Sequence, residues 1–91
     1  MNKIVTINAV KISIQSECAA AVKHGKTVAE VKSAMLANYG TNGKIEDATL
    51  RDQLTLWGYD VRPDADRDAV RAAENMHAAH DLVETALALG A

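Results

Sequence analysis

Glycine and proline divide this chain into four segments, each bounded by residues that begin and end helices. The breaks fall at Gly25, Gly40, Gly58, Pro63 and Gly90. Glycine after a helix accepts the left-handed conformation that closes the last turn, and proline suits a first turn. A chain of 91 residues has room for one domain. We therefore predict a single all-α domain, residues 1–91, built as four helices with a helix–loop–helix unit at its centre.

The first and last segments predict the longest helices. Asn8 can cap a helix that runs to about His24, and Pro63 with Asp64 can open a helix that runs to about Leu89. The predicted apolar stripe of the first helix is Ile7, Val10, Ile14, Cys18 and Ala21. The predicted core side of the last helix includes Ala69, Ala72, Met76, Ala79, Val83 and Leu87. Each set has helical spacing, so each helix is expected to bury one face.

The two central segments predict shorter helices. Thr27 and Glu30 form a capping box, in which the Thr27 hydroxyl accepts from the Glu30 backbone while Glu30 reaches back. The helix that this box opens is expected to end at Tyr39. Asp47 can cap a third helix, which Gly58 closes. The apolar residues of the third helix are Leu50, Leu54 and Trp57.

Some short runs favour extended backbone instead. Residues 4–7 and 10–14 are rich in β-branched side chains, and the second run alternates with polar residues. A short N-terminal strand or hairpin is therefore the main structural alternative there. Residues 59–62 can also be extended, and residues 40–43 predict a flexible loop.

Charge is sorted along the chain. Six lysines and two glutamates occupy residues 1–44, whereas four arginines and ten acidic residues occupy residues 45–91. The two halves therefore carry formal charges of +4 and −6, which give the net charge of −2. Because patches of one sign attract partners of the other, this asymmetry is the main sequence clue to function.

The residue types that perform catalysis or bind metals form no catalytic constellation in this sequence. Cys18 is the single cysteine, and its place on the apolar stripe predicts a buried, inert thiol. Glu74 and His77 have the spacing of carboxylate-bridged metal sites. Surface pairing at i, i+4 is the simpler interpretation, and it joins His77 to Asp81 and His80 to Glu84. We expect no enzyme, no metal site and no cofactor.

The stretch from Thr27 to Arg62 contains a capped helix, a loop, a second helix and an extended tail. In this order it resembles the helix-turn-helix or winged-helix core of DNA-binding proteins. The resemblance covers about a third of the chain, and it implies a small transcriptional regulator whose second helix enters the major groove. The DNA-binding residues that it implies are Lys44, Thr49, Arg51, Asp52 and Gln53. DNA binding is the alternative function.

The leading function rests on acidic and aromatic residues of the C-terminal half. The partner-binding candidates are Trp57, Tyr59, Asp60, Asp64, Asp66 and Asp68. Aromatic residues dominate interface hot spots, and acidic residues complement a basic partner surface. Two alternatives stay open. The aspartates can instead complement the dipole at a helix start, and the aromatic rings can belong to the core.

In general character the chain is similar to small phage- or mobile-element-encoded proteins that block a host nuclease or CRISPR complex. This resemblance implies a non-enzymatic inhibitor that binds a host or cognate protein, such as a nucleic-acid-binding complex, through its acidic half. A homodimer stays open, and DNA is a partner only in the alternative. The single cysteine and the lack of a long apolar run lead us to expect a cytoplasmic protein without a membrane partner.

Overall fold

The computed structural model describes residues 3–22, 25–63 and 72–90, which form four helices and two small pairs of strands. The elements are β1 (Lys3–Thr6), α1 (Ile7–Val22), α2 (Val28–Tyr39), β2 (Gly40–Thr41), β3 (Lys44–Ile45), α3 (Asp47–Leu56), β4 (Tyr59–Arg62) and α4 (Ala72–Gly90). The fold is mostly helical and contains the four predicted helices. The strands are additions to the all-α prediction.

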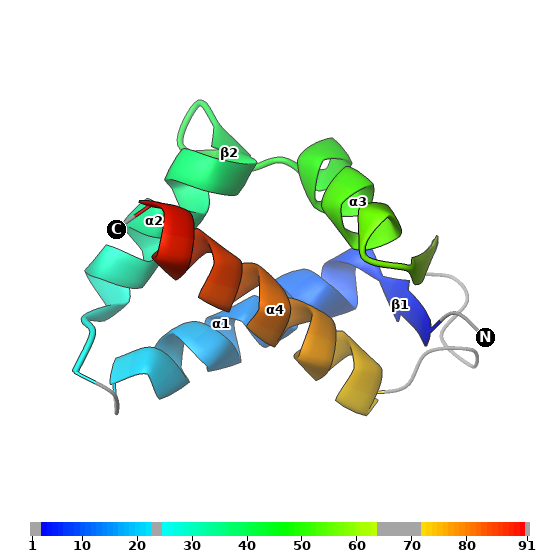
Figure 1. The fold of residues 1–91 in the computed structure, drawn as a ribbon, viewed down its shortest axis with the longest axis horizontal. Coiled ribbons are helices and arrows are strands. Elements are labelled where there is room, and N and C mark those ends of the chain that lie inside the picture. Colours follow the sequence, from blue (N-terminus) through cyan, green and yellow to red (C-terminus); the bar gives the residue numbers. More distant parts are fainter. Residues whose placement is uncertain (1–2, 23–24, 64–71, 91) are drawn as a thin grey trace.

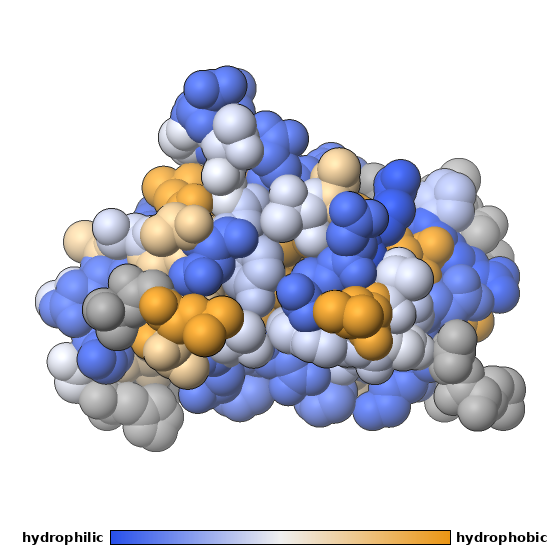
Figure 2. Space-filling model, turned by 45° about the horizontal axis from the view of Figure 1, so that its top comes forward, coloured by the Kyte–Doolittle hydropathy of each residue, from blue (hydrophilic) through white to orange (hydrophobic). Residues whose placement is uncertain are grey.

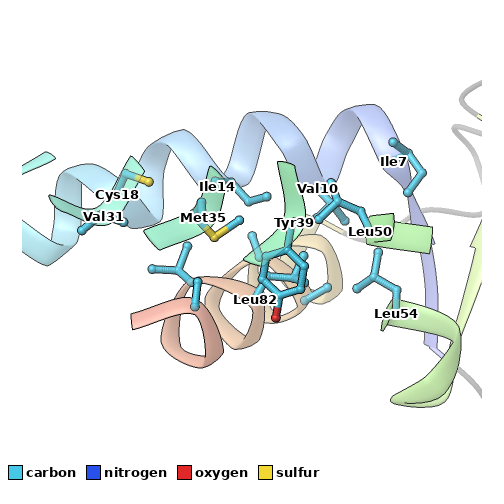
Figure 3. Packing of buried hydrophobic residues seen from close by; sticks show 14 of the residues in the cluster. Ile7, Val10, Ile14, Cys18, Val31, Met35, Tyr39, Leu50, Leu54 and Leu82 are labelled. Atoms are coloured by element: carbon cyan, nitrogen blue, oxygen red, sulfur yellow. The ribbon is translucent and has the colours of Figure 1, made fainter. Parts of the chain in front are cut away.

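The core lies where α4 packs across α1 and α2, and Figure 1 shows α4 crossing in front of α1. The predicted stripe of α1 is buried at all of its positions, so that prediction is confirmed. Figure 3 shows side chains from α1, α2 and α3 converging on Leu82 of α4. The helices therefore share one core, to which α3 contributes Leu50 and Leu54.

The N-terminal strand forms, but its partner is remote in sequence. β1 pairs in parallel with β4, with Val5 opposite Val61. Residues 59–62 are thus extended, as the sequence allowed. Residues 10–14 are helical instead, because Val10 and Ile14 at i, i+4 both reach the core from α1. The hairpin form of the alternative was wrong, whereas the strand was correct.

The core side of α4 differs from the prediction. Ala79 and Val83 are buried, but Ala72 and Met76 are exposed. The buried stripe comprises Asn75, Ala78, Ala79, Leu82, Val83 and Ala86. The small alanines on this stripe let neighbouring helices approach closely. The part of this helix predicted before Ala72, including Ala69, lies outside the described residues.

Two helix starts also differ from the prediction. Thr6 precedes α1, and its Oγ1 accepts from the backbone N–H of Ala9 at 3.4 Å, so Asn8 lies inside the first turn. Glu46 holds the N-cap position of α3, and Asp47 instead binds Lys11 across to α1, with Nζ and Oδ1 2.9 Å apart. β1 leads directly into α1, and only Glu46 separates β3 from α3. Both helices therefore begin where a strand ends, and not after the predicted caps Asn8 and Asp47.

The capping box of α2 is confirmed. The Glu30 N–H donates to Thr27 Oγ1 at 3.1 Å, and that hydroxyl donates to the Glu30 carboxylate at 3.2 Å. Both groups therefore stabilise the first turn of α2.

Candidate binding surfaces

Residues exposed on α3 form the first candidate surface. Leu50 and Leu54 are buried, so the opposite side of the helix faces solvent. The exposed residues from the third position of α3 onward are Thr49, Arg51, Asp52, Thr55 and Leu56. Leu56 is 79 % exposed, the highest exposure among the large hydrophobic side chains with a described position. Figure 2 shows that apolar residues on the face in view form separate islands among hydrophilic ones.

The two aromatic candidates differ in exposure. Trp57 is partly buried against the core at the C-cap of α3, and part of its surface stays accessible. Tyr59 is buried, with 6 % of its surface exposed, and belongs to the core in this structure. Leu56 was not among the sequence candidates. Its place two residues after Leu54, off the buried stripe, is the signal that points to it.

Of the four acidic candidates, the structure describes Asp60 alone. Asp60 lies on β4, and its Oδ2 accepts from Arg62 Nε at 3.2 Å and from Nη2 at 3.1 Å. Both side chains are partly exposed, so this pair partly offsets the negative charge there. Asp64, Asp66 and Asp68 lie outside the described residues.

The residues implied by DNA binding do not sit in a helix-turn-helix arrangement. Thr49, Arg51 and Asp52 are exposed on α3, Lys44 is exposed on β3, and Gln53 is half-buried. A β2–β3 hairpin separates α2 from α3 (Figure 1), whereas a helix-turn-helix joins two packed helices by a short turn.

That hairpin corrects the prediction of a flexible loop. Its turn is Asn42-Gly43, with φ angles of 54° and 77°. Positive φ at both residues is typical of a type I′ turn, which matches the twist of the flanking strands. Residues 40–45 therefore form a structured hairpin.

The second candidate surface is a groove of about 700 Å³ between α1, α2 and the hairpin. Most of its lining is apolar, and three lysines join it. The lining comprises Lys11, Ile14, Gln15, Cys18, Ala19, Val28, Lys32, Met35, Leu36, Gly43, Lys44 and Ile45. Cys18 belongs to this lining, and its side chain is buried, as predicted. Burial raises the pKa of the thiol, and the nearby charge of Lys32 opposes that shift. This surface needs three elements, so no single sequence motif indicates it.

A polar cluster joins β4 to α4. The Tyr59 hydroxyl lies 2.7 Å from His77 Nδ1 and 3.1 Å from Asp81 Oδ2, and Lys3 Nζ lies 3.4 Å from the same Nδ1. Burial, followed by the hydrogen bond to Asp81, raises the pKa of Tyr59 to about 12. The phenol is therefore protonated at neutral pH, and it can donate to Asp81 while accepting from His77. A pocket of about 250 Å³ lies between this cluster and Trp57.

The predicted histidine pairs form, but each histidine has a shorter contact with another element. His77 Nε2 lies 3.6 Å from Asp81, and His80 Nε2 lies 3.9 Å from Glu84. His80 Nδ1 lies only 2.8 Å from Glu17 on α1. The hydrogen bond to Glu17 is the largest cause that raises the pKa of His80.

Among residues 3–22, 25–63 and 72–90, no group of three histidine, cysteine or acidic side chains could hold a metal ion. None of the described helices is long and apolar enough to cross a membrane. No protein family, curated protein or solved structure matches this chain.

Proposed function

We propose that this protein is a non-enzymatic binding protein that acts through protein–protein contact, with the end of α3 at the centre of the interface. The supporting observation is the adjacency of Leu56, which is 79 % exposed, to the partly exposed ring of Trp57. The pocket of about 250 Å³ beside Trp57 adds a concave feature to this surface. A protruding apolar residue, an aromatic ring and a nearby pocket are the elements from which interface hot spots are built.

The charges around this surface support a basic partner. Asp52 lies one turn before Leu56 on the same side of α3, and Asp60 lies nearby on β4, where Arg62 partly offsets its charge. The finer proposal is that the partner is a host nucleic-acid-binding complex, and that the protein inhibits it by covering basic residues needed for nucleic acid. Complementary charges would then speed association and fix the orientation of the two proteins.

The test is affinity capture from a bacterial lysate by the tagged protein, with and without nuclease, read by quantitative mass spectrometry. Leu56→Ala is compared with Thr55→Ala, since both residues are exposed on α3. We expect a protein that survives nuclease, is kept by Thr55→Ala and falls about tenfold with Leu56→Ala. If every retained protein is indifferent to Leu56, this interface is wrong.

DNA binding remains the alternative, because Thr49 and Arg51 are exposed on the same helix. It makes opposite predictions for the same capture. Nuclease would abolish the signal, Arg51→Ala would remove binding to duplex DNA, and Leu56→Ala would not. Binding would also weaken steeply with added salt, because phosphate contacts release counterions.

A further inference from the structure

We propose that the groove between α1, α2 and the β2–β3 hairpin is a second binding site, which takes an acidic amphipathic helix from a partner protein. This inference goes beyond the proposed function, because the groove is lined by elements other than α3. It would give the protein two interfaces with opposite charge preferences.

The apolar lining of the groove favours an occupant that has an apolar side. Ile14, Cys18 and Met35 are almost fully buried in the core (Figure 3), whereas Val28, Leu36 and Ile45 are exposed or half-buried apolar residues of the groove lining. A nucleic-acid backbone would leave Val28, Leu36 and Ile45 uncovered, since it binds through charged and polar contacts. Apolar side chains from a partner would remove this surface from water, which favours association.

The lysines in the groove lining favour an occupant with negative charge. Among the residues that the structure describes, the groove lining contains three lysines and no acidic residue. Lys11 is paired with Asp47, whereas Lys32 and Lys44 make no ion pair among the residues that the structure describes. A partner with carboxylates beside its apolar stripe would neutralise both.

The shape of the groove favours a helical segment over a small molecule. Small ligands are usually enclosed over most of their surface, whereas this groove is open to solvent along one side. Lys32 comes from α2 and Lys44 from β3, so the two positive charges belong to different elements of the groove. An amphipathic helix presents apolar residues at i, i+3, i+4 and i+7 with flanking charges, which fits an apolar floor with charged borders.

The test uses two synthetic peptides of about 18 residues, or about five helical turns, with leucines at that spacing. One peptide carries glutamates beside the leucine stripe, and the other carries lysines at the same places. Backbone amide NMR of the labelled protein locates the binding site. We expect the acidic peptide to shift groove amides, including those of Ala19, Val28 and Ile45, and the basic peptide to leave them unchanged.

Charge reversal gives the decisive comparison. The double variant Lys32→Glu, Lys44→Glu is expected to lose at least about tenfold in affinity for the acidic peptide and to gain binding of the basic one. Arg51→Glu, an exposed charge on α3, is the matched control and should change neither. Both lysines are exposed, so the double variant is expected to fold, which circular dichroism checks.

Four results would overturn the proposal. A lack of groove-amide shifts with either peptide, or equal binding of both peptides, would exclude a charge-selective helix site. Dodecanoate alone could shift the groove amides, which would assign the groove to a free anionic amphiphile. Self-association that needs Lys32 and Lys44 in the absence of peptide would assign it to a second copy of this chain. Leu56→Ala should leave peptide binding intact, so failure here is separate from failure of the proposed function.

Discussion

The side-chain amide oxygen of Asn75 accepts a hydrogen bond from the backbone N–H of Thr6 at 3.1 Å, and both residues are buried. This bond joins the end of β1 to α4 across most of the sequence. It also explains why a polar residue occupies the core stripe of α4, since Thr6 would otherwise keep an unpaired buried donor.

Asn75→Ala is therefore expected to lower the free energy of unfolding by about 1–3 kcal/mol, the cost of leaving a buried donor without its partner. Met76→Ala, at the exposed neighbouring position, is the control and should cost much less. Urea denaturation followed by circular dichroism measures both. Equal effects of the two substitutions would show that the Thr6–Asn75 bond contributes little.

Leu54 and Leu56 offer a matched pair on α3, because one is fully buried and the other is 79 % exposed. Leu54→Ala should lower the free energy of unfolding by about 2–5 kcal/mol through loss of apolar contact and a residual cavity. Leu56→Ala should change it by about 0.5 kcal/mol or less. Thermal unfolding of both variants checks this difference. A large loss with Leu56→Ala would mean that its effect on partner binding reflects stability instead.

Glu17 should control the titration of His80. The pKa of His80 is raised above its ordinary 6.5, first by the hydrogen bond to Glu17. The raised pKa means that this contact stabilises the fold fully below pH 6.5 and stops doing so as pH rises through the folded pKa. Because His80 is half exposed, the contribution is small, about a few tenths of a kcal/mol.

Glu17→Gln is expected to lower the pKa of His80 in an NMR titration and to destabilise the protein more under mildly acidic than under alkaline conditions. Glu84→Gln is the control and should have a smaller effect, because Glu84 lies 3.9 Å from the ring. An unchanged His80 titration in Glu17→Gln would contradict the assignment.

Tyr59 should lose protons only under strongly alkaline conditions. Its pKa of about 12 lies above the ordinary 10.0, so folding favours the neutral phenol. The stability from this preference is complete below pH 10 and is lost as pH rises toward 12. Tyr59→Phe should flatten this alkaline decline, and absorbance titration of the phenol should show Asp81→Asn lowering the pKa partway. Burial, the largest cause, remains in Asp81→Asn, so a return to the ordinary value would contradict the assigned order of causes.

A side chain at Gly40 should destabilise the fold. A Cβ there would lie 2.8 Å from the Leu36 carbonyl oxygen and 2.9 Å from Leu36 Cα, both backbone atoms that cannot move freely. Gly40→Ala is expected to cost about 1–3 kcal/mol of unfolding free energy, as overpacking does. Thr41→Ala, at the exposed next position of β2, is the control for the loss of strand propensity. Chemical denaturation that finds the two variants equally stable would rule out this steric conflict.

Local patterns predicted much of the fold. The stripe of α1 repeats at helical spacing from Ile7 to Ala21, and the capping box of Thr27 lies within one turn, so neither depends on distant residues. The Asn42-Gly43 turn also has a local sequence signal, because this dipeptide strongly favours a hairpin turn. Its flanking strands have only two residues each, which is too short for an alternating strand pattern, so the sequence alone favours a loop at residues 40–43.

The other features of the structure depend on contacts between residues that are far apart in the sequence. The alanines of α4 are compatible with several apolar faces, and the face that is buried includes Asn75, which accepts a hydrogen bond from the backbone of Thr6. The groove likewise depends on how α1, α2 and the hairpin come together, which no local pattern specifies. Leu56 could have been identified from its offset to Leu54, but its exposure follows from the orientation of α3.

The parallel pairing of β1 with β4 has a consequence for the order in which the chain folds. Lys3 pairs with Tyr59, so this ladder joins residues that are far apart in the sequence. Bringing together two strands that are so far apart in the sequence costs conformational entropy, and this cost grows with the length of the closed loop. The helices can therefore form early, and β1 and β4 would be among the last elements to reach their native partners.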